Sequence, residues 1–175
     1  LAGIFFKDSL QETLMLYPLL IGAVCMVATV IGTYFVRLGK SENIMGALYK
    51  GFFGTAVISA VAIAVLTHLV LGFDTSYAAE GYSFTGLNLV YCAYTGLVVT
   101  ALLVWITEYY TSTRFSPVQG IAEASETGHA TNIIRGLAVS MQSTALPVIV
   151  ICGGILVSYL NAHLFGVAIA ATAML

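Results

Sequence analysis

The chain has 175 residues, of which 59% are hydrophobic and only 8% are charged, and its mean hydropathy is +0.98. Soluble domains carry about 25% charged residues, so this composition excludes a soluble globular fold. It also excludes intrinsic disorder, which needs low hydrophobicity and high charge. The net charge of −2 argues against the basic stripe of a nucleic-acid-binding protein. We therefore expect an integral membrane protein whose partner is the lipid bilayer and not a nucleic acid.

Four apolar stretches are long enough to cross a bilayer, because a hydrocarbon core of about 30 Å needs about 20 helical residues. They are residues 17–36, 52–71, 87–106 and 136–160, and none of them contains Asp, Glu, Lys or Arg. A fifth stretch, 164–175, would reach only about 18 Å as a helix, and residues 1–6 resemble the end of a preceding helix. We expect an all-α, polytopic transmembrane helical bundle of four full spans plus a truncated fifth, in a segment of a larger protein.

The basic residues indicate the orientation, because loops rich in Lys and Arg stay in the cytoplasm. Five of the six lie in or beside the first and third connections, namely Arg37, Lys40, Lys50, Arg114 and Arg135. The second connection holds Asp74 and Glu80 and no basic residue. We therefore expect loops 37–51 and 107–135 to be cytoplasmic, and the second connection to face outward together with Lys7.

Small residues within the spans predict where helices approach one another. Ala56, Ala60 and Ala64 form a small-xxx-small row on the second span, which favours close helix packing. In the fourth span, the Gly153-Gly154 pair and Pro147 predict a kink or a close crossing.

The cysteines carry no signal of a disulfide framework or a zinc site. Their number is odd, they are far apart, and each lies in an apolar run: Cys25, Cys92 and Cys152. We expect all three to be buried thiols.

The third connection contains a predicted short amphipathic helix within residues 111–133. Residues 116–119 (SPVQ) match a capping box with Ser116 as the N-cap and Pro117 at the first helical position. Gly128 is placed to end this helix. Thr131 or Asn132 is then expected to cap the next transmembrane helix.

Glu108 is the main candidate for a functional side chain, since it directly follows the third span. A carboxylate at a helix C-terminus is opposed by the helix dipole, and no Lys or Arg lies three or four residues away. One interpretation is an interfacial glutamate that reaches headgroup water. The other is an ionisable group that faces the bundle interior near an ion route.

The remaining polar candidates carry weaker signals. His68 is expected to be packed or interfacial, His129 solvated, and His163 placed in a tight outer turn. The turn at 128–131 precedes a helix and could bind phosphate on free backbone N–H groups. No His or carboxylate pair has metal-ligand spacing.

Three consecutive sequence blocks resemble one known family. They are TEYYTS (107–112), SPVQGIAEASETGHATNII (116–134) and RGLAVSMQSTALPV (135–148). In this order and spacing they are similar to the membrane-integral pyrophosphatases, and most similar to the bacterial proton-pumping branch. The resemblance covers the whole chain. It implies a homodimeric pump that couples hydrolysis of Mg²⁺-pyrophosphate to H⁺ (or Na⁺) transport across a membrane, most simply the bacterial inner membrane.

The family's acidic motifs, which hold pyrophosphate and Mg²⁺, are missing from this chain. No Asp-x-x-x-Asp occurs, and the only aspartates are Asp8 and Asp74. No catalytic, metal-binding or substrate-binding residue can therefore be carried over, and the segment is expected to supply mainly scaffold spans. Glu108 matches the glutamate of the family's TEYYT element, which does not contact substrate directly, so it is a candidate for ion coupling or for structure.

Two other classes remain as alternatives. A secondary transporter or channel subunit would show ionisable residues or broken helices at mid-membrane. A purely structural bundle fits the composition but leaves the ordered motifs at 107–148 unexplained.

Overall fold

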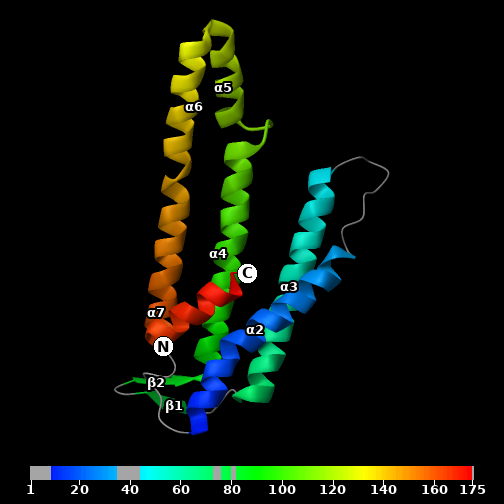
Figure 1. Cartoon of the computed structure of the whole chain (residues 1–175), viewed down its shortest axis with the longest axis vertical. Coiled ribbons are helices and arrows are strands. Elements are labelled where there is room, and N and C mark those ends of the chain that lie inside the picture. The colour runs from blue at the N-terminus through cyan, green and yellow to red at the C-terminus, as the bar shows by residue number, and fades with distance from the viewer. Residues whose placement is uncertain (1–8, 35–43, 73–75, 80–81, 175) are drawn as a thin grey trace. The chain divides into compact units, whose positions relative to one another are not determined.

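The computed structural model describes residues 9–34, 44–72, 76–79 and 82–174. Several residues of the sequence predictions lie outside these ranges: residues 1–6, Lys7, Asp8, Arg37, Lys40, Asp74 and Glu80. The elements are α2 (Ser9–Thr33), α3 (Ile44–Val70), β1 (Ser76–Ala79), β2 (Tyr82–Thr85), α4 (Gly86–Thr111), α5 (Ser116–Thr127), α6 (His129–Ser143) and α7 (Ala145–Ala173) (Figure 1).

The described chain is helical apart from one small hairpin, which confirms the all-α fold. Four helical stretches are long and apolar enough to cross a membrane: Leu14–Thr33, Gly46–Val70, Gly86–Thr127 and His129–Ala173. The connection between α3 and α4 contains β1 and β2, paired antiparallel with Ser76 opposite Thr85. The apolar-run analysis did not predict this hairpin, since two four-residue strands leave no usable hydrophobic period.

The chain divides into two units. The first comprises Leu1–Leu97 with Ile155–Leu175, and the second comprises Val98–Gly154. The core of the first unit is built where α2, α3, the start of α4 and the end of α7 meet. Its completely or almost completely buried side chains include Leu14, Tyr17, Ile21, Ile63, Leu89, Cys92, Phe165 and Ile169.

Within the first unit, α2 and α3 pack in an antiparallel register that polar and small residues define. The Tyr17 hydroxyl lies 2.8 Å from Thr67 Oγ1, and Cys25 is hydrogen-bonded to Ser59. Thr67 already donates its single proton to the Ile63 carbonyl at 2.7 Å, so Tyr17 is the donor to Thr67. In apolar surroundings such interhelical hydrogen bonds fix which faces of two helices meet.

The contact with α2 is made by a different stripe from the alanine row, for which the sequence predicted no particular partner; the Ala60 carbonyl accepts from the Tyr94 hydroxyl of α4 at 3.2 Å. The contacting stripe of α3 is one residue earlier and consists of Thr55, Ser59, Ile63 and Thr67. Gly32 lies so close to Thr55 that a Cβ on Gly32 would overlap it. Both stripes have i+4 spacing, and the sequence alone does not distinguish them, because Ser and Thr also permit close approach and bond to the i−4 carbonyl.

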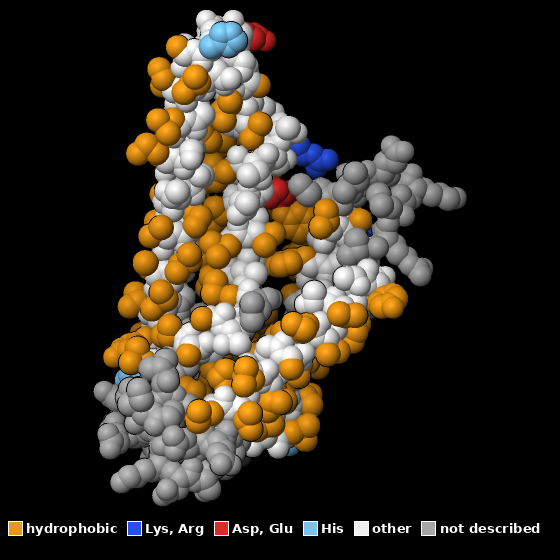
Figure 2. All heavy atoms as spheres, in the orientation of Figure 1, with side chains coloured by type: hydrophobic (Ala, Val, Ile, Leu, Met, Phe, Trp, Pro, Cys, Tyr) orange, Lys and Arg blue, Asp and Glu red, His pale blue; other side chains and the backbone are white. Residues whose placement is uncertain are grey.

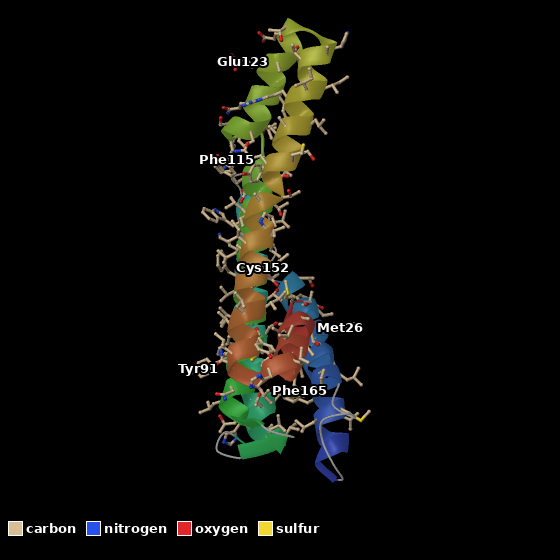
Figure 3. All side chains as sticks on the ribbon, turned by 90° about the vertical axis from the view of Figure 1, so that its left-hand side faces the viewer. Met26, Tyr91, Phe115, Glu123, Cys152 and Phe165 are labelled. Carbon is tan, nitrogen blue, oxygen red and sulfur yellow. The ribbon has the colours of Figure 1, made fainter. Side chains whose placement is uncertain are left out.

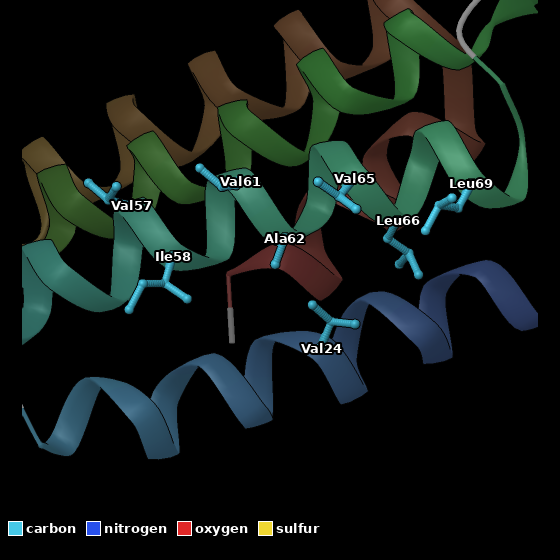
Figure 4. A pocket seen from close by; sticks show the side chains of 8 residues that line it. All are labelled: Val24, Val57, Ile58, Val61, Ala62, Val65, Leu66 and Leu69. Carbon is cyan, nitrogen blue, oxygen red and sulfur yellow. The ribbon is translucent and has the colours of Figure 1, made fainter.

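The groove beside this contact is lined only by aliphatic side chains. It has a volume of about 520 Å³, with Val24 contributed by α2 and the other lining residues by α3 (Figure 4): Val57, Ile58, Val61, Ala62, Val65, Leu66 and Leu69. Large aliphatic side chains are also exposed along the other helices, as Figure 2 shows for one face of the molecule. This distribution is expected of helices that face lipid or other helices instead of water.

The helix is interrupted at Thr144, one turn before Pro147, in agreement with the kink predicted there, whereas the backbone at the Gly153-Gly154 pair is helical. Pro147 lies in the first turn of α7, where its missing N–H is tolerated, and α6 has already ended at Ser143. A Cβ on Gly153 would meet no described atom within 4 Å. The backbone of α7 is non-helical at Ala162 and His163, so α7 consists of two helical parts joined at this bend, in agreement with the turn predicted at His163 and the separate fifth stretch after it.

Candidate functional site

The described charged side chains gather in the second unit. Lys50 lies on α3, whereas the others follow one another from the end of α4 to α6: Glu108, Arg114, Glu123, Glu126 and Arg135. Figure 2 shows acidic and histidine side chains at the end of the α5–α6 hairpin. Among the charged side chains whose positions are described, all but Lys50 therefore lie between the end of α4 and α6.

Glu108 lies in the last turn of α4 and is partly buried. Its carbonyl accepts the backbone N–H of Ser112 at 2.9 Å. The hydroxyls of Thr107 and Thr111 each donate to the carbonyl four residues earlier, at 2.7 Å. Helix α4 thus remains regular through the TEYYT element, which fixes the position of the Glu108 backbone.

An aromatic cluster closes the corner after α4. The ring of Tyr109 lies 5.1 Å from that of Tyr110, nearly perpendicular to it, and 5.2 Å from that of Phe115. Edge-on contacts of this kind are favourable. The corner at residues 112–115 is therefore packed against the end of α4.

Helix α5 begins differently from the sequence prediction. Its N-cap is Phe115, in an extended conformation and without a side-chain cap, and Ser116 is already helical. Gln119 does not close a capping box. Its side-chain amide instead donates to the carbonyls of Thr113 and Arg114, both at 3.3 Å. The capping-box pattern was wrong because Gln119 bonds to the carbonyls of the preceding corner in place of a backbone N–H.

The turn between α5 and α6 is formed by Gly128, with φ 142° and ψ 167°, a conformation that favours glycine. Thr131 does not cap α6. Its hydroxyl oxygen lies 2.7 Å from the Gly128 carbonyl oxygen and 3.0 Å from that of Ala124, so its single proton points back to one of these carbonyls, and it lies 2.8 Å from the Thr127 hydroxyl. Helix α6 instead begins at His129 with Gly128 as its N-cap, so the expected Thr131 or Asn132 cap is wrong.

Arg135 ties α6 to α5. A Cβ on Gly120 would lie 3.2 Å from Nη2 and 3.3 Å from Nε of Arg135, so the guanidinium lies directly on the α5 backbone. From the sequence, Arg135 indicated only the orientation of the third connection. The contact of an arginine in α6 with a glycine in α5 can be predicted only when the two helices are already known to pack against each other.

The other candidates are dispersed. His68 lies exposed in the last turn of α3, His129 is exposed at the start of α6, and His163 lies at the bend of α7. Within the described residues, no group of three His, Cys, Asp or Glu could hold a metal ion. Cys25 and Cys92 are buried as expected, but Cys152 is exposed on α7 (Figure 3), so its predicted burial is wrong.

Comparison with known proteins identifies the family. The family model for inorganic H⁺ pyrophosphatase matches residues 1–175. The chain belongs to this family. It is an integral, multi-pass membrane protein, as the four membrane-capable helical stretches also indicate.

Individual relatives agree with this H⁺ pyrophosphatase assignment. The chain is 53% identical over 175 residues to a pyrophosphate-energized proton pump 2 of Rhizobium leguminosarum bv. trifolii, with 99% of this chain and 81% of the relative covered. It is 52% identical over 176 residues to a protein of the same name from Mycoplana dimorpha, covering 100% and 85%. A K(+)-insensitive pyrophosphate-energized proton pump of Methanosarcina mazei is 40% identical over 169 residues. That alignment covers 92% of this chain but only 23% of the relative.

Proposed function

We propose that this chain is part of a pump that couples hydrolysis of Mg²⁺-pyrophosphate to H⁺ translocation across a bacterial inner membrane. Membership of the H⁺ pyrophosphatase family is the observation that carries the proposal. Moving one charge against 100 mV costs about 2.3 kcal/mol, so net uphill transport needs a driving reaction such as pyrophosphate hydrolysis. We propose that the full protein works as a homodimer in the bilayer.

The residues that the structure describes do not fit a Mg²⁺-pyrophosphate site. Mg²⁺ takes carboxylate oxygens as its protein ligands, and the described residues contain no group of three possible ligands. Glu123 and Glu126 are exposed on a 12-residue helix, and Glu108 lies on a different element. We therefore assign the magnesium ligands and the hydrolytic step to other parts of the polypeptide, and assign mainly scaffold spans to this segment.

We propose an orientation in which loops 37–51 and 107–135 are cytoplasmic. It is supported by Lys50, Arg114 and Arg135, which lie in or beside these loops. In this orientation the α5–α6 hairpin begins on the cytoplasmic side, and the connection that carries β1 and β2 faces outward.

The deciding experiment is a vesicle assay of the full-length protein. Addition of Mg²⁺ and pyrophosphate outside inverted vesicles should release phosphate and acidify the lumen, and a protonophore should abolish the acidification while leaving phosphate release intact. Acidification that occurs without pyrophosphate and follows an imposed ion gradient would instead identify a secondary transporter or channel. Assays with and without K⁺ determine whether the pump shares the K⁺ insensitivity named for two relatives.

We propose that Glu108 contributes to coupling. The proposal is supported by a partly buried carboxylate at the rigid end of α4, next to the packed Tyr109, Tyr110 and Phe115 rings. Glu108→Gln keeps the size and removes the charge, so it should lower the ratio of H⁺ pumped to pyrophosphate hydrolysed. Glu123→Gln, an exposed change on α5, is the matched control. Equal ratios for both variants would leave Glu108 as an interfacial residue.

A further inference from the structure

His163 adopts a backbone conformation that residues with a Cβ rarely tolerate. Its φ is 48° and its ψ is −145°, and among the described residues it is the only non-glycine with positive φ. In this region the Cβ approaches the neighbouring backbone too closely, so the conformation is strained and persists only where the surroundings enforce it. Ala162, the residue before it, is also non-helical, with φ −148° and ψ 30°.

The surroundings of the bend are packed backbone against backbone. Cys92 of α4 donates from Sγ to the carbonyl of Ser158 at 3.6 Å. A Cβ on Gly166 would lie 2.6 Å from that carbonyl oxygen and 2.8 Å from Cys92 Sγ. A Cβ on Gly96 would overlap the carbonyl oxygen of Ala170. The residues on both sides of the bend thus pack against α4, and this packing holds the strained conformation in place.

A second unfavourable feature lies within the same two turns. The Ser158 hydroxyl is completely buried and has no hydrogen-bond partner among the described residues. A buried hydroxyl without a partner raises the free energy of the arrangement that contains it. Backbone strain at His163 and an unsatisfied hydroxyl at Ser158 therefore both destabilise the present conformation of the bend, while the glycine contacts with α4 stabilise it.

Strain that the packing holds in place is typical of segments that switch between two arrangements. We propose that Ala162 and His163 form a strained two-state joint in α7. In the conformation described here, packing on α4 holds His163 at positive φ. In the second conformation the backbone of His163 leaves the strained region, and residues 164–173 change their angle to the residues before the bend. This inference goes beyond the proposed pump function, because it assigns a moving part to a segment otherwise interpreted as scaffold.

The first test compares His163→Gly with His163→Ala in the full-length protein. Both variants lose the imidazole and its edge contact with the Tyr159 ring, and they differ only in the Cβ. At a strained positive-φ position the glycine variant should unfold at the higher temperature. At an ordinary helical position alanine is more stable than glycine. Gly153→Ala should therefore raise the unfolding temperature relative to the wild-type protein. An alanine variant as stable as the glycine variant would overturn the joint.

The second test asks whether there are two conformations, and it rests on the proposed function for its ligand. Spin labels at Val157 and Ala171, both exposed and on opposite sides of the bend, report the angle in a Cys152→Ser background. We expect two distances whose populations shift on addition of Mg²⁺ and imidodiphosphate. In His163→Gly the population of the second conformation should shrink, because the described conformation is no longer strained.

A single distance that is unchanged by ligand and by His163→Gly would refute the two-state joint. Failure of the proposed function is recognised separately, since the wild-type protein would then release no phosphate from pyrophosphate. The comparison of the glycine and alanine variants does not depend on that outcome.

Discussion

The crossing of α4 and α7 in the first unit allows one prediction to be worked through in detail. Gly96→Ala places a Cβ where the carbonyl oxygen of Ala170 lies, and the carbon atoms of that residue's backbone are only 3.1 and 3.3 Å away. A flexible side chain could move aside, but here the obstacle is helix backbone. The two helices must therefore separate, and the neighbouring contact between Gly166, Cys92 and Ser158 would be disturbed with them.

The size of the effect follows from two opposing contributions. Replacing a helical glycine by alanine gains about 1 kcal/mol from helix propensity. Overpacking a well-packed contact costs about 1–3 kcal/mol, and occasionally more. Because the overlap is with backbone, we expect the upper end of that range and a net loss of about 1–2 kcal/mol for Gly96→Ala. Gly153→Ala gains the same propensity without any contact within 4 Å, so it is the matched control.

The assay is thermal unfolding of the full-length protein in detergent. Unfolding is monitored as the fraction of protein that stays monodisperse after heating to each temperature. Gly96→Ala should lower the midpoint, whereas Gly153→Ala should leave it unchanged or raise it. The shift per kcal/mol falls with chain length, so for the longer full-length protein we expect less than the about 2–4 °C per kcal/mol of a 150–250-residue chain. If Gly96→Ala is as stable as Gly153→Ala, α4 and α7 do not cross at Gly96, and the reasoning is refuted.

Three further predictions follow from named contacts. Tyr17→Phe removes the hydrogen bond to Thr67, and hydrogen bonds between membrane helices average about 0.6 kcal/mol. It should therefore lower the unfolding midpoint slightly. The control Tyr91→Phe changes an exposed ring of α4 and should leave the midpoint unchanged. Gln119→Ala removes both amide bonds to the corner carbonyls and should speed proteolytic cleavage at residues 112–115, whereas Gln142→Ala, at an exposed position on α6, should leave that rate unchanged. Equal cleavage rates would contradict the role of Gln119. Glu126→Cys in a Cys152→Ser background should react with an impermeant maleimide only from the cytoplasmic side, and labelling from outside would reverse the proposed orientation.

The fold class could be predicted from the sequence because uninterrupted apolar runs without charge have few stable solutions in a bilayer. The ends of the helices could not, because hydropathy marks only the residues that cross hydrocarbon. Helix α4, for example, continues through polar Thr107 and Glu108 to Thr111. The turn before the fifth stretch could be located from the sequence, and the break of α7 at Ala162 and His163 agrees with it, but the packing that holds His163 at positive φ could not.

The candidate site was predictable only in part. The TEYYT pattern located Glu108, and the apolar and turn residues of 111–133 located the region of α5. Contacts that depend on two elements at once were missed: Arg135 on Gly120, and Gln119 on the carbonyls of Thr113 and Arg114. Which stripe of α3 meets α2 could not be predicted for the same reason, since the alanine row and the row at Thr55, Ser59 and Thr67 differ by one position and only the partner helix distinguishes them.

The polar contacts between α2 and α3 also constrain how these helices find each other during membrane insertion. Tyr17 with Thr67 and Cys25 with Ser59 keep the same antiparallel offset, since eight residues separate the partners on each helix. A slip of one helical turn would place the Tyr17 hydroxyl opposite Ile63 and Thr67 beyond its reach, leaving a donor in hydrocarbon without an acceptor. Aliphatic residues would pack almost as well in the slipped arrangement, so they cannot reject it. The hydroxyl and thiol pairs thus allow a newly inserted pair of helices to distinguish the correct pairing from its neighbours before the other helices are in place.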